Sequence, residues 1–320
     1  MKRFVAAILL CIGISLQCLS QNIYEDPRVE YTPQYFMDGS FEICKEANLI
    51  DLDSLYYNQP VNAGLVRTYC YLSHVMIGQR IGNDNIESNL KTIEESIGKD
   101  NSIYALALIP KAAEKEEDLG ILLEAAEIIE RHSGIYSWEY AFAMYMASSF
   151  TQDGDRYGGI LTSLEYADKC ISILEDEHKD SWLYKLAVVN RGAARMLNSD
   201  PDGFYEIHEA IKSFDTDNDS QKLIPAIKAF ITFSTLLTMA GEHDSAILLL
   251  DGFDHVFNES ELQSTEMYMA ANRTLCYAYA MKKDKKKAKI HYEKAEQACI
   301  ERFGKGSRQY KSLQQYRTMF

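Results

Sequence analysis

From Ala63 to the C-terminus, apolar residues recur every three or four positions, and short polar turns interrupt the pattern. This spacing places apolar side chains on one face of an α-helix. No stretch alternates apolar and polar residues over enough length to indicate a strand. The pattern predicts an all-α chain with helices over 62–80, 84–97, 102–115, 118–132, 136–151, 160–176, 181–197, 203–214, 222–240, 243–257, 262–282, 285–303 and 307–319.

Composition agrees with a helical chain and limits its partners. The sequence has 17 glycines and 6 prolines among 320 residues, about 7% where average usage is roughly 12%. β-Sandwiches, β-barrels and doubly wound sheets need many such turn residues, so the shortage favours a helical fold. The formal net charge of −14 repels phosphate backbones, so nucleic acid is not expected as a partner.

Residues 1–20 have the pattern of an export signal. Lys2 and Arg3 precede an apolar run from Phe4 to Leu16, and Cys18 to Ser20 places small residues before a cut at Gln21. The run of about 13 residues is shorter than the roughly 20 that span a bilayer. We therefore expect a removed signal peptide, a periplasmic or extracellular mature chain, and no stable membrane span after cleavage. A retained anchor or a lipoprotein is the less favoured alternative.

Five cysteines follow the predicted cut: Cys44, Cys70, Cys170, Cys276 and Cys299. Their odd number, and the absence of any CxxC pair in the sequence, favour neither a disulfide framework nor a zinc ribbon. We expect small buried side chains on helices. A disulfide between Cys276 and Cys299 stays open, because both lie in one predicted hairpin.

The last two predicted hairpins share a pattern of small and aromatic residues. The final one has Leu275, Cys276 and Tyr279 on one face of its first helix, and Ala288, Tyr292 and Ala295 on one face of its second. The hairpin before it has Phe230, Phe233, Ser234 and Leu237, followed by Ala246, Leu250 and Phe253. This pattern resembles the tetratricopeptide repeat (TPR), with Cys276 at the usual small position. Ala246 and Ala288 are 42 residues apart, more than the roughly 34 of the plain repeat, which is similar to the longer kinesin light chain variety.

The resemblance implies a right-handed α-α superhelix, or solenoid, of stacked hairpins over 61–320, with 21–60 as an N-terminal capping segment. It further implies a non-catalytic scaffold that binds a protein or peptide segment in a concave groove lined by first helices. The groove positions would be Lys228, Ile231, Thr235, Met239, Arg273, Tyr277 and Met281. Ordinary solvated helix surface is the alternative interpretation of these seven.

One basic cluster stands out in this acidic chain. It consists of Lys282, Lys283, Lys285, Lys286, Lys287 and Lys289, at the turn of the last hairpin. Lysines at the C-terminal end of a helix are stabilised by the partial negative charge there, which explains much of the cluster without a function. A docking patch for an acidic partner is the functional hypothesis.

No motif in the sequence indicates catalysis. The seven histidines lack metal-ligand spacing, and GxSxG, phosphate-binding glycine loops and calcium loops are absent from the sequence. We therefore expect no catalytic residue, metal or cofactor. Two rivals stay open: a small-ligand or glycan binder with a tyrosine-rich groove, and an all-α carbohydrate-active enzyme. The oligomeric state also stays open.

Overall fold

The computed structural model describes residues 27–46, 59–115, 117–152, 159–214, 223–252, 256–257 and 261–320. These residues form helices and turns, with no strand among them, as the periodicity predicts. The predicted signal peptide lies outside the described residues, as does the first part of the capping segment. No helix in the described part of the chain is both long enough and apolar enough to cross a membrane.

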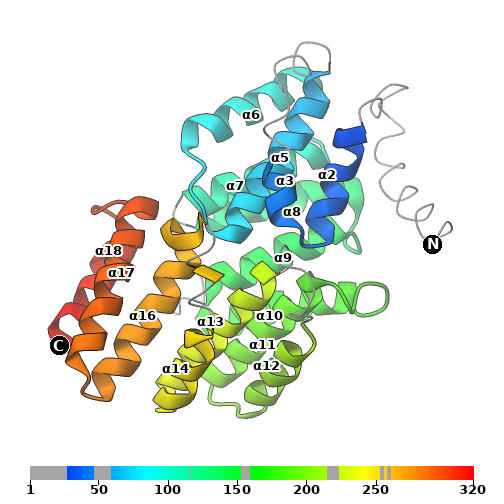
Figure 1. Cartoon of the computed structure of the whole chain (residues 1–320). Helices are drawn as coiled ribbons and strands as arrows, with labels where there is room; N and C mark the ends of the chain where they lie inside the picture. Colours follow the sequence, from blue (N-terminus) through cyan, green and yellow to red (C-terminus); the bar gives the residue numbers. More distant parts are fainter. Residues whose placement is uncertain are drawn as a thin grey trace.

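Successive helices pair as hairpins along the chain (Figure 1). The first helices of these pairs are α5 (Pro60–Ile77), α7 (Ser102–Glu114), α9 (Trp138–Thr151), α11 (Trp182–Leu197), α13 (Leu223–Met239) and α16 (Glu266–Met281). Their partners are α6 (Asn83–Ile97), α8 (Leu119–Ser133), α10 (Gly159–Leu174), α12 (Asp202–Lys212), α14 (His243–Asp251) and α17 (Lys285–Phe303). First helices also pack on one another, for example α11 on α13 and α13 on α16.

The same polar cap begins several first helices and α18 (Arg308–Gln314). In each case a side-chain oxygen accepts a hydrogen bond of 2.9–3.2 Å from the backbone N–H of a tyrosine three residues later. The pairs are Asn101–Tyr104, Ser137–Tyr140, Ser181–Tyr184, Thr265–Tyr268 and Ser307–Tyr310. Such a cap satisfies a backbone donor that the helix itself cannot pair. Its recurrence indicates that the hairpins repeat one local design.

The small residues of the last hairpin lie where the pattern predicts, between its two helices. Cys276, Ala288 and Ala295 are fully buried, and Tyr279 and Tyr292 are less than a tenth exposed. All five cysteines in the described part of the chain are buried and free, so the Cys276–Cys299 disulfide is not formed. Burial raises the pKa of both thiols to about 11, which keeps them protonated and unreactive at neutral pH.

Helix ends differ from the prediction by more than three residues in three places. The helix predicted over 243–257 ends as α14 at Asp251, where Gly252 follows; glycine is a poor helix former. The one predicted over 262–282 begins with a separate 3-10 helix, η3 (Glu261–Ser264), before α16. The last one turns from α18 into a second 3-10 helix, η4 (Gln315–Met319).

The described part of the capping segment holds two helices, α2 (Pro27–Met37) and the short α3 (Phe41–Glu46). Pro33 lies inside α2, where proline removes a backbone hydrogen bond. Packing offsets this cost, because Phe36 is fully buried and meets Trp138, Phe142 and Trp182 edge-on. We call this contact of α2 and α3 with α9 and α11 the aromatic closure.

Hydrogen bonds from Trp182 fix the aromatic closure. Its indole Nε1 donates to the carbonyl oxygens of Phe36 and Met37 at 3.2 and 2.9 Å. Gly39 has a positive φ of 82°, and a Cβ there would lie 3.0 Å from the Trp182 ring. Only glycine therefore fits this turn without strain.

The C-terminal hairpin closes the array by polar contacts with its beginning. The backbone N–H of Glu266, at the start of α16, donates to the carbonyl of Gly78 at 3.0 Å. Arg302 pairs with Glu114 at 3.0 Å, and Arg308 pairs with Glu117 at 3.4 Å. We call these contacts the ionic closure; α16 to α18 lie across the molecule from α2 and α3 (Figure 1).

Candidate functional site

A pocket of about 410 Å³ lies beside the ionic closure. Its walls come from the first helices α5, α7, α9, α13 and α16, from the end of α17, and from the turns after α5 and α17. A second pocket of about 200 Å³ adjoins it and extends to α11. Four residues line both pockets: Tyr145, Ser149, Lys228 and Glu266. The two pockets therefore adjoin on the side of the first helices, and we call them together the interior space.

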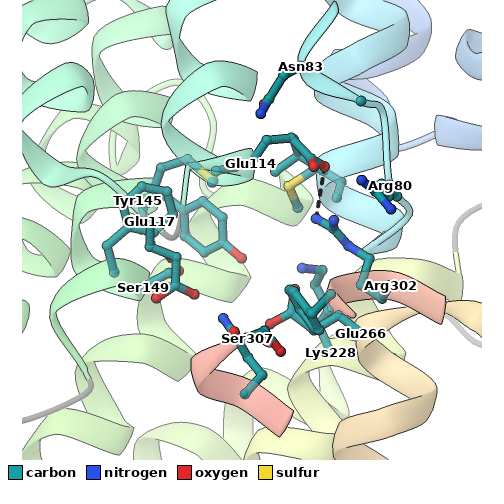
Figure 2. Close-up of a pocket in the computed structure, with 18 of the residues that line it drawn as sticks. Arg80, Asn83, Glu114, Glu117, Tyr145, Ser149, Lys228, Glu266, Arg302 and Ser307 are labelled. Atoms are coloured by element: carbon teal, nitrogen blue, oxygen red, sulfur yellow. Dashed lines mark hydrogen bonds and ion pairs between the residues drawn. The ribbon is translucent and has the colours of Figure 1, made fainter. Parts of the chain in front are cut away.

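A buried ion pair forms one wall of the larger pocket (Figure 2). The side chains of Arg302 and Glu114 are only 6% and 7% exposed. Glu114 also accepts a hydrogen bond of 3.2 Å from the backbone N–H of Ile81. The Nε of Arg302 is buried and has no hydrogen-bond partner in the described part of the chain. Such an unpaired donor is costly, and a ligand or water in the pocket would satisfy it.

Lys228 and Glu266 lie near each other at the junction of the two pockets (Figure 2). No ion pair or hydrogen bond joins their side chains, and neither side chain has another such partner among the described residues. Desolvation lowers the pKa of Lys228, and the negative charge of Glu266 opposes that shift only in part. Burial therefore disfavours the charged amine, and no close counter-ion compensates it.

Two hydroxyl groups from α9 complete the junction. Ser149 Oγ donates to the carbonyl of Tyr145 at 3.2 Å and accepts from Asn190 Nδ2 at 2.9 Å. Tyr145 is 5% exposed, and burial raises the pKa of its hydroxyl well above the ordinary value. The phenol therefore stays neutral at physiological pH, and it forms a side-chain hydrogen bond with Ser149.

Two of the seven predicted groove residues line the interior space. Lys228 contributes to both pockets and Ile231 to the smaller one. Thr235 instead bonds to Thr274 at 2.9 Å, between α13 and α16. Met239 and Met281 are 64% and 48% exposed at the ends of their helices.

The other two predicted groove residues lie farther along α16. The ring of Tyr277 packs edge-on against His243 and against Tyr316 of η4. Arg273 is half-buried. The C-terminal 3-10 helix η4 therefore covers part of the α16 surface that the repeat pattern assigned to a partner.

The six lysines of the basic cluster are exposed around the turn between α16 and α17. Lys282 pairs with Asp244, and Lys289 lies 3.8 Å from Glu293. The Lys287 amine lies 4.8 Å from the centre of the Tyr279 ring. Intramolecular contacts therefore account for half of the cluster.

No family model matches this chain, and no curated protein matches it. The site must therefore be interpreted from its own chemistry. Within the described ranges, no group of three or more histidine, cysteine or acidic side chains is placed to hold a metal ion.

The sequence analysis did not single out Tyr145, Ser149, Glu114, Glu266 or Arg302. Glu114 and Arg302 come from helices separated by most of the chain, so no spacing motif connects them. One signal was available: Arg302 lies one residue before the end of α17, on the same face as the small residues Ala295 and Ala298. A charged residue on the buried face of a helix usually has a partner.

Proposed function

We propose that this chain is an exported, non-catalytic binding protein built as a TPR-like solenoid, and that its ligand lies on the concave side. The recurring caps support the repeat architecture, as do the paired helices and the small residues between α16 and α17. Stacked hairpins of this kind form right-handed superhelices whose first helices line the inner wall.

The interior space carries the proposal for binding. It is walled by first helices and holds two hydroxyl groups and two charged side chains that are unpaired within the described residues. Ligand pockets of proteins measure roughly 300–1,000 Å³, and the larger pocket measures about 410 Å³. That space suits a short peptide segment or a small polar ligand, and it is too small for a folded partner.

A protein partner on the outside is the second candidate. Met239 and Met281 are exposed at equivalent ends of α13 and α16, close to the lysine cluster. Methionines adapt to varied apolar partners. An acidic segment with apolar residues would suit this edge.

Export is part of the same proposal and has its own test. N-terminal sequencing of the protein from its native host should find a mature chain that begins at Gln21. A chain that retains Met1 would contradict the cleaved signal peptide. A lipid on Cys18 would show instead that the protein is a lipoprotein.

The binding proposal is tested by filling the pocket. Ser149→Trp places an indole at the junction, and Ser172→Trp makes the same change at an exposed position of α10. The tagged variants are crosslinked lightly in the native envelope and purified, and mass spectrometry identifies peptides and small molecules that accompany them. Circular dichroism checks that both variants fold.

A ligand that accompanies the wild type and Ser172→Trp, but not Ser149→Trp, would support the interior site. A protein partner that Ser149→Trp retains and Met281→Glu loses would move binding to the outer edge. Turnover of a carbohydrate by the purified protein would contradict the non-catalytic assignment.

A further inference from the structure

Lys228 and Glu266 are opposite charges that share a cavity without pairing. Both line the two pockets, and neither side chain forms an ion pair or hydrogen bond within the described ranges. Partly buried charges of opposite sign gain most when they meet directly or when something between them bonds to each. Because both side chains line the same two pockets without bonding to each other, a ligand that carries both complementary groups would pair them.

The other charged side chains that line the pockets, among the described residues, are either paired or exposed. Glu114 is engaged by Arg302, and Glu117 by Arg308. Arg80 is exposed at the edge of the pocket. The buried Nε of Arg302, which has no partner in the described part of the chain, adds one further donor on the side of the larger pocket.

We propose that the junction binds a small zwitterion, with a carboxylate on Lys228 and an ammonium group on Glu266. This inference rests on the proposed interior binding site and names the chemistry of its ligand. The Arg302 Nε–H and the hydroxyl groups of Tyr145 and Ser149 are the additional hydrogen-bonding groups. The size of the space fits a free α-amino acid or a dipeptide, and both sources carry the same pair of charges.

We expect the charge of Lys228 to contribute to ligand binding and not to the stability of the fold. A lysine that stabilises a structure pairs with a carboxylate, so its removal leaves that carboxylate uncompensated. Within the described ranges Lys228 has no such partner, and the same desolvation that lowers its pKa also makes its charge costly. Lys228→Met should therefore keep or raise the melting temperature while it weakens binding.

The experiment uses the mature chain and measures melting temperature with each of the standard α-amino acids and with dialanine. Propionate and ethylamine, which carry one charge each, are the matched single-charge probes. A bound ligand at concentration c raises the free energy of unfolding by RT ln(1 + c/Kd), so the melting temperature rises with the logarithm of the ligand concentration once that exceeds Kd. At least one zwitterion should raise it, and both single-charge probes should leave it unchanged; the rank of amino acids against dialanine identifies the source.

Calorimetry then measures Kd for the best probe on the variants. Lys228→Met and Glu266→Gln should each weaken binding about tenfold or more, the loss expected for one charge-assisted hydrogen bond. Lys286→Met, a matched change at an exposed lysine of the turn, should leave Kd unchanged.

A melting temperature that no zwitterion raises would overturn the inference, as would a stability loss in Lys228→Met comparable to that of a broken buried ion pair. If a ligand still co-purifies with wild type and not with Ser149→Trp, the interior site stands and only its zwitterion chemistry fails. If neither approach finds a ligand in the interior, both proposals fail together.

Discussion

The two ends of the helical array are closed by opposite kinds of chemistry. At the N-terminal side, Phe36 and Trp182 belong to a cluster of aromatic rings, and the two indole hydrogen bonds go to backbone carbonyls. At the C-terminal side, arginine–glutamate pairs join the last hairpin to the turn and helix around Glu114. The interior space lies against the second closure.

The two closures differ in how much their contacts contribute to the stability of the fold. Aromatic rings gain free energy from leaving water and from edge-on contact with each other. A buried ion pair gains little net stability over an apolar contact of the same shape, because its desolvation offsets its attraction. We infer that the aromatic closure stabilises the fold, and that the ionic closure places polar groups where a ligand needs them.

The largest expected effect is at the aromatic closure. Trp182→Ala should lower the free energy of unfolding by about 4 kcal/mol, since it leaves a cavity among the rings. Trp182→Phe retains a ring and loses only the hydrogen bonds to Phe36 and Met37, so its loss should be about 1–2 kcal/mol. Urea denaturation followed by circular dichroism measures both.

Tyr205, which is 68% exposed, provides the control for this comparison. Tyr205→Ala should change the free energy of unfolding by less than about 0.5 kcal/mol. Equal losses from Trp182→Ala and Tyr205→Ala would show that the N-terminal segment adds nothing to the stability of the array.

The buried ion pair comes next. Arg302→Met alone leaves Glu114 buried with only the Ile81 backbone bond, and the free energy of unfolding should fall by about 3 kcal/mol. Arg302→Met combined with Glu114→Leu removes both charges, and much of that loss should return. A double-mutant cycle that includes Glu114→Leu measures the coupling.

Additive losses in that cycle would contradict the ion pair as a coupled unit. The double variant could instead be as stable as the wild type and no longer bind its ligand. This outcome would make the contrast between the two closures sharper. It would show that the ionic closure is retained for the pocket and not for the fold.

The same contrast explains what the sequence could predict. Helix positions and the buried small residues of the last hairpin follow from local periodicity, which depends only on residues a few positions apart. The sequence did not predict helix α2, because Pro33 weakens its local helix signal. Contacts of Phe36 with Trp138 and Trp182, more than a hundred residues away, stabilise the helix in spite of the proline. Tertiary packing overrides local preference there.

Most of the candidate site could not be predicted, for a similar reason. Lys228 and Ile231 came from the resemblance to the repeat family, and both line the interior space, whereas the other five positions taken from that resemblance do not. Glu114 and Arg302 meet only because the last hairpin folds back on the first ones. No spacing within one helix carries that information.

The smallest expected effect is at the outer part of the ionic closure. The side chains of Arg308 and Glu117 are 41% and 30% exposed and lie 3.4 Å apart. Arg308→Gln should lower the free energy of unfolding by only about 0.5 kcal/mol, as for most exposed ion pairs. Urea denaturation of wild type and variant should be compared at about 0.1 and about 1 M salt, between which the screening length falls from roughly 10 to roughly 3 Å.

Salt should abolish the difference between Arg308→Gln and wild type, while the loss in Arg302→Met should persist. Bulk ions reach the outer pair but not the inner one, since Arg302 and Glu114 are almost fully enclosed. Equal salt dependence in the two variants would mean that solvent ions enter the closure freely. The interior space would then be too well hydrated for Lys228 and Glu266 to bind a zwitterion tightly, so this small effect tests the dielectric environment on which the proposed site depends.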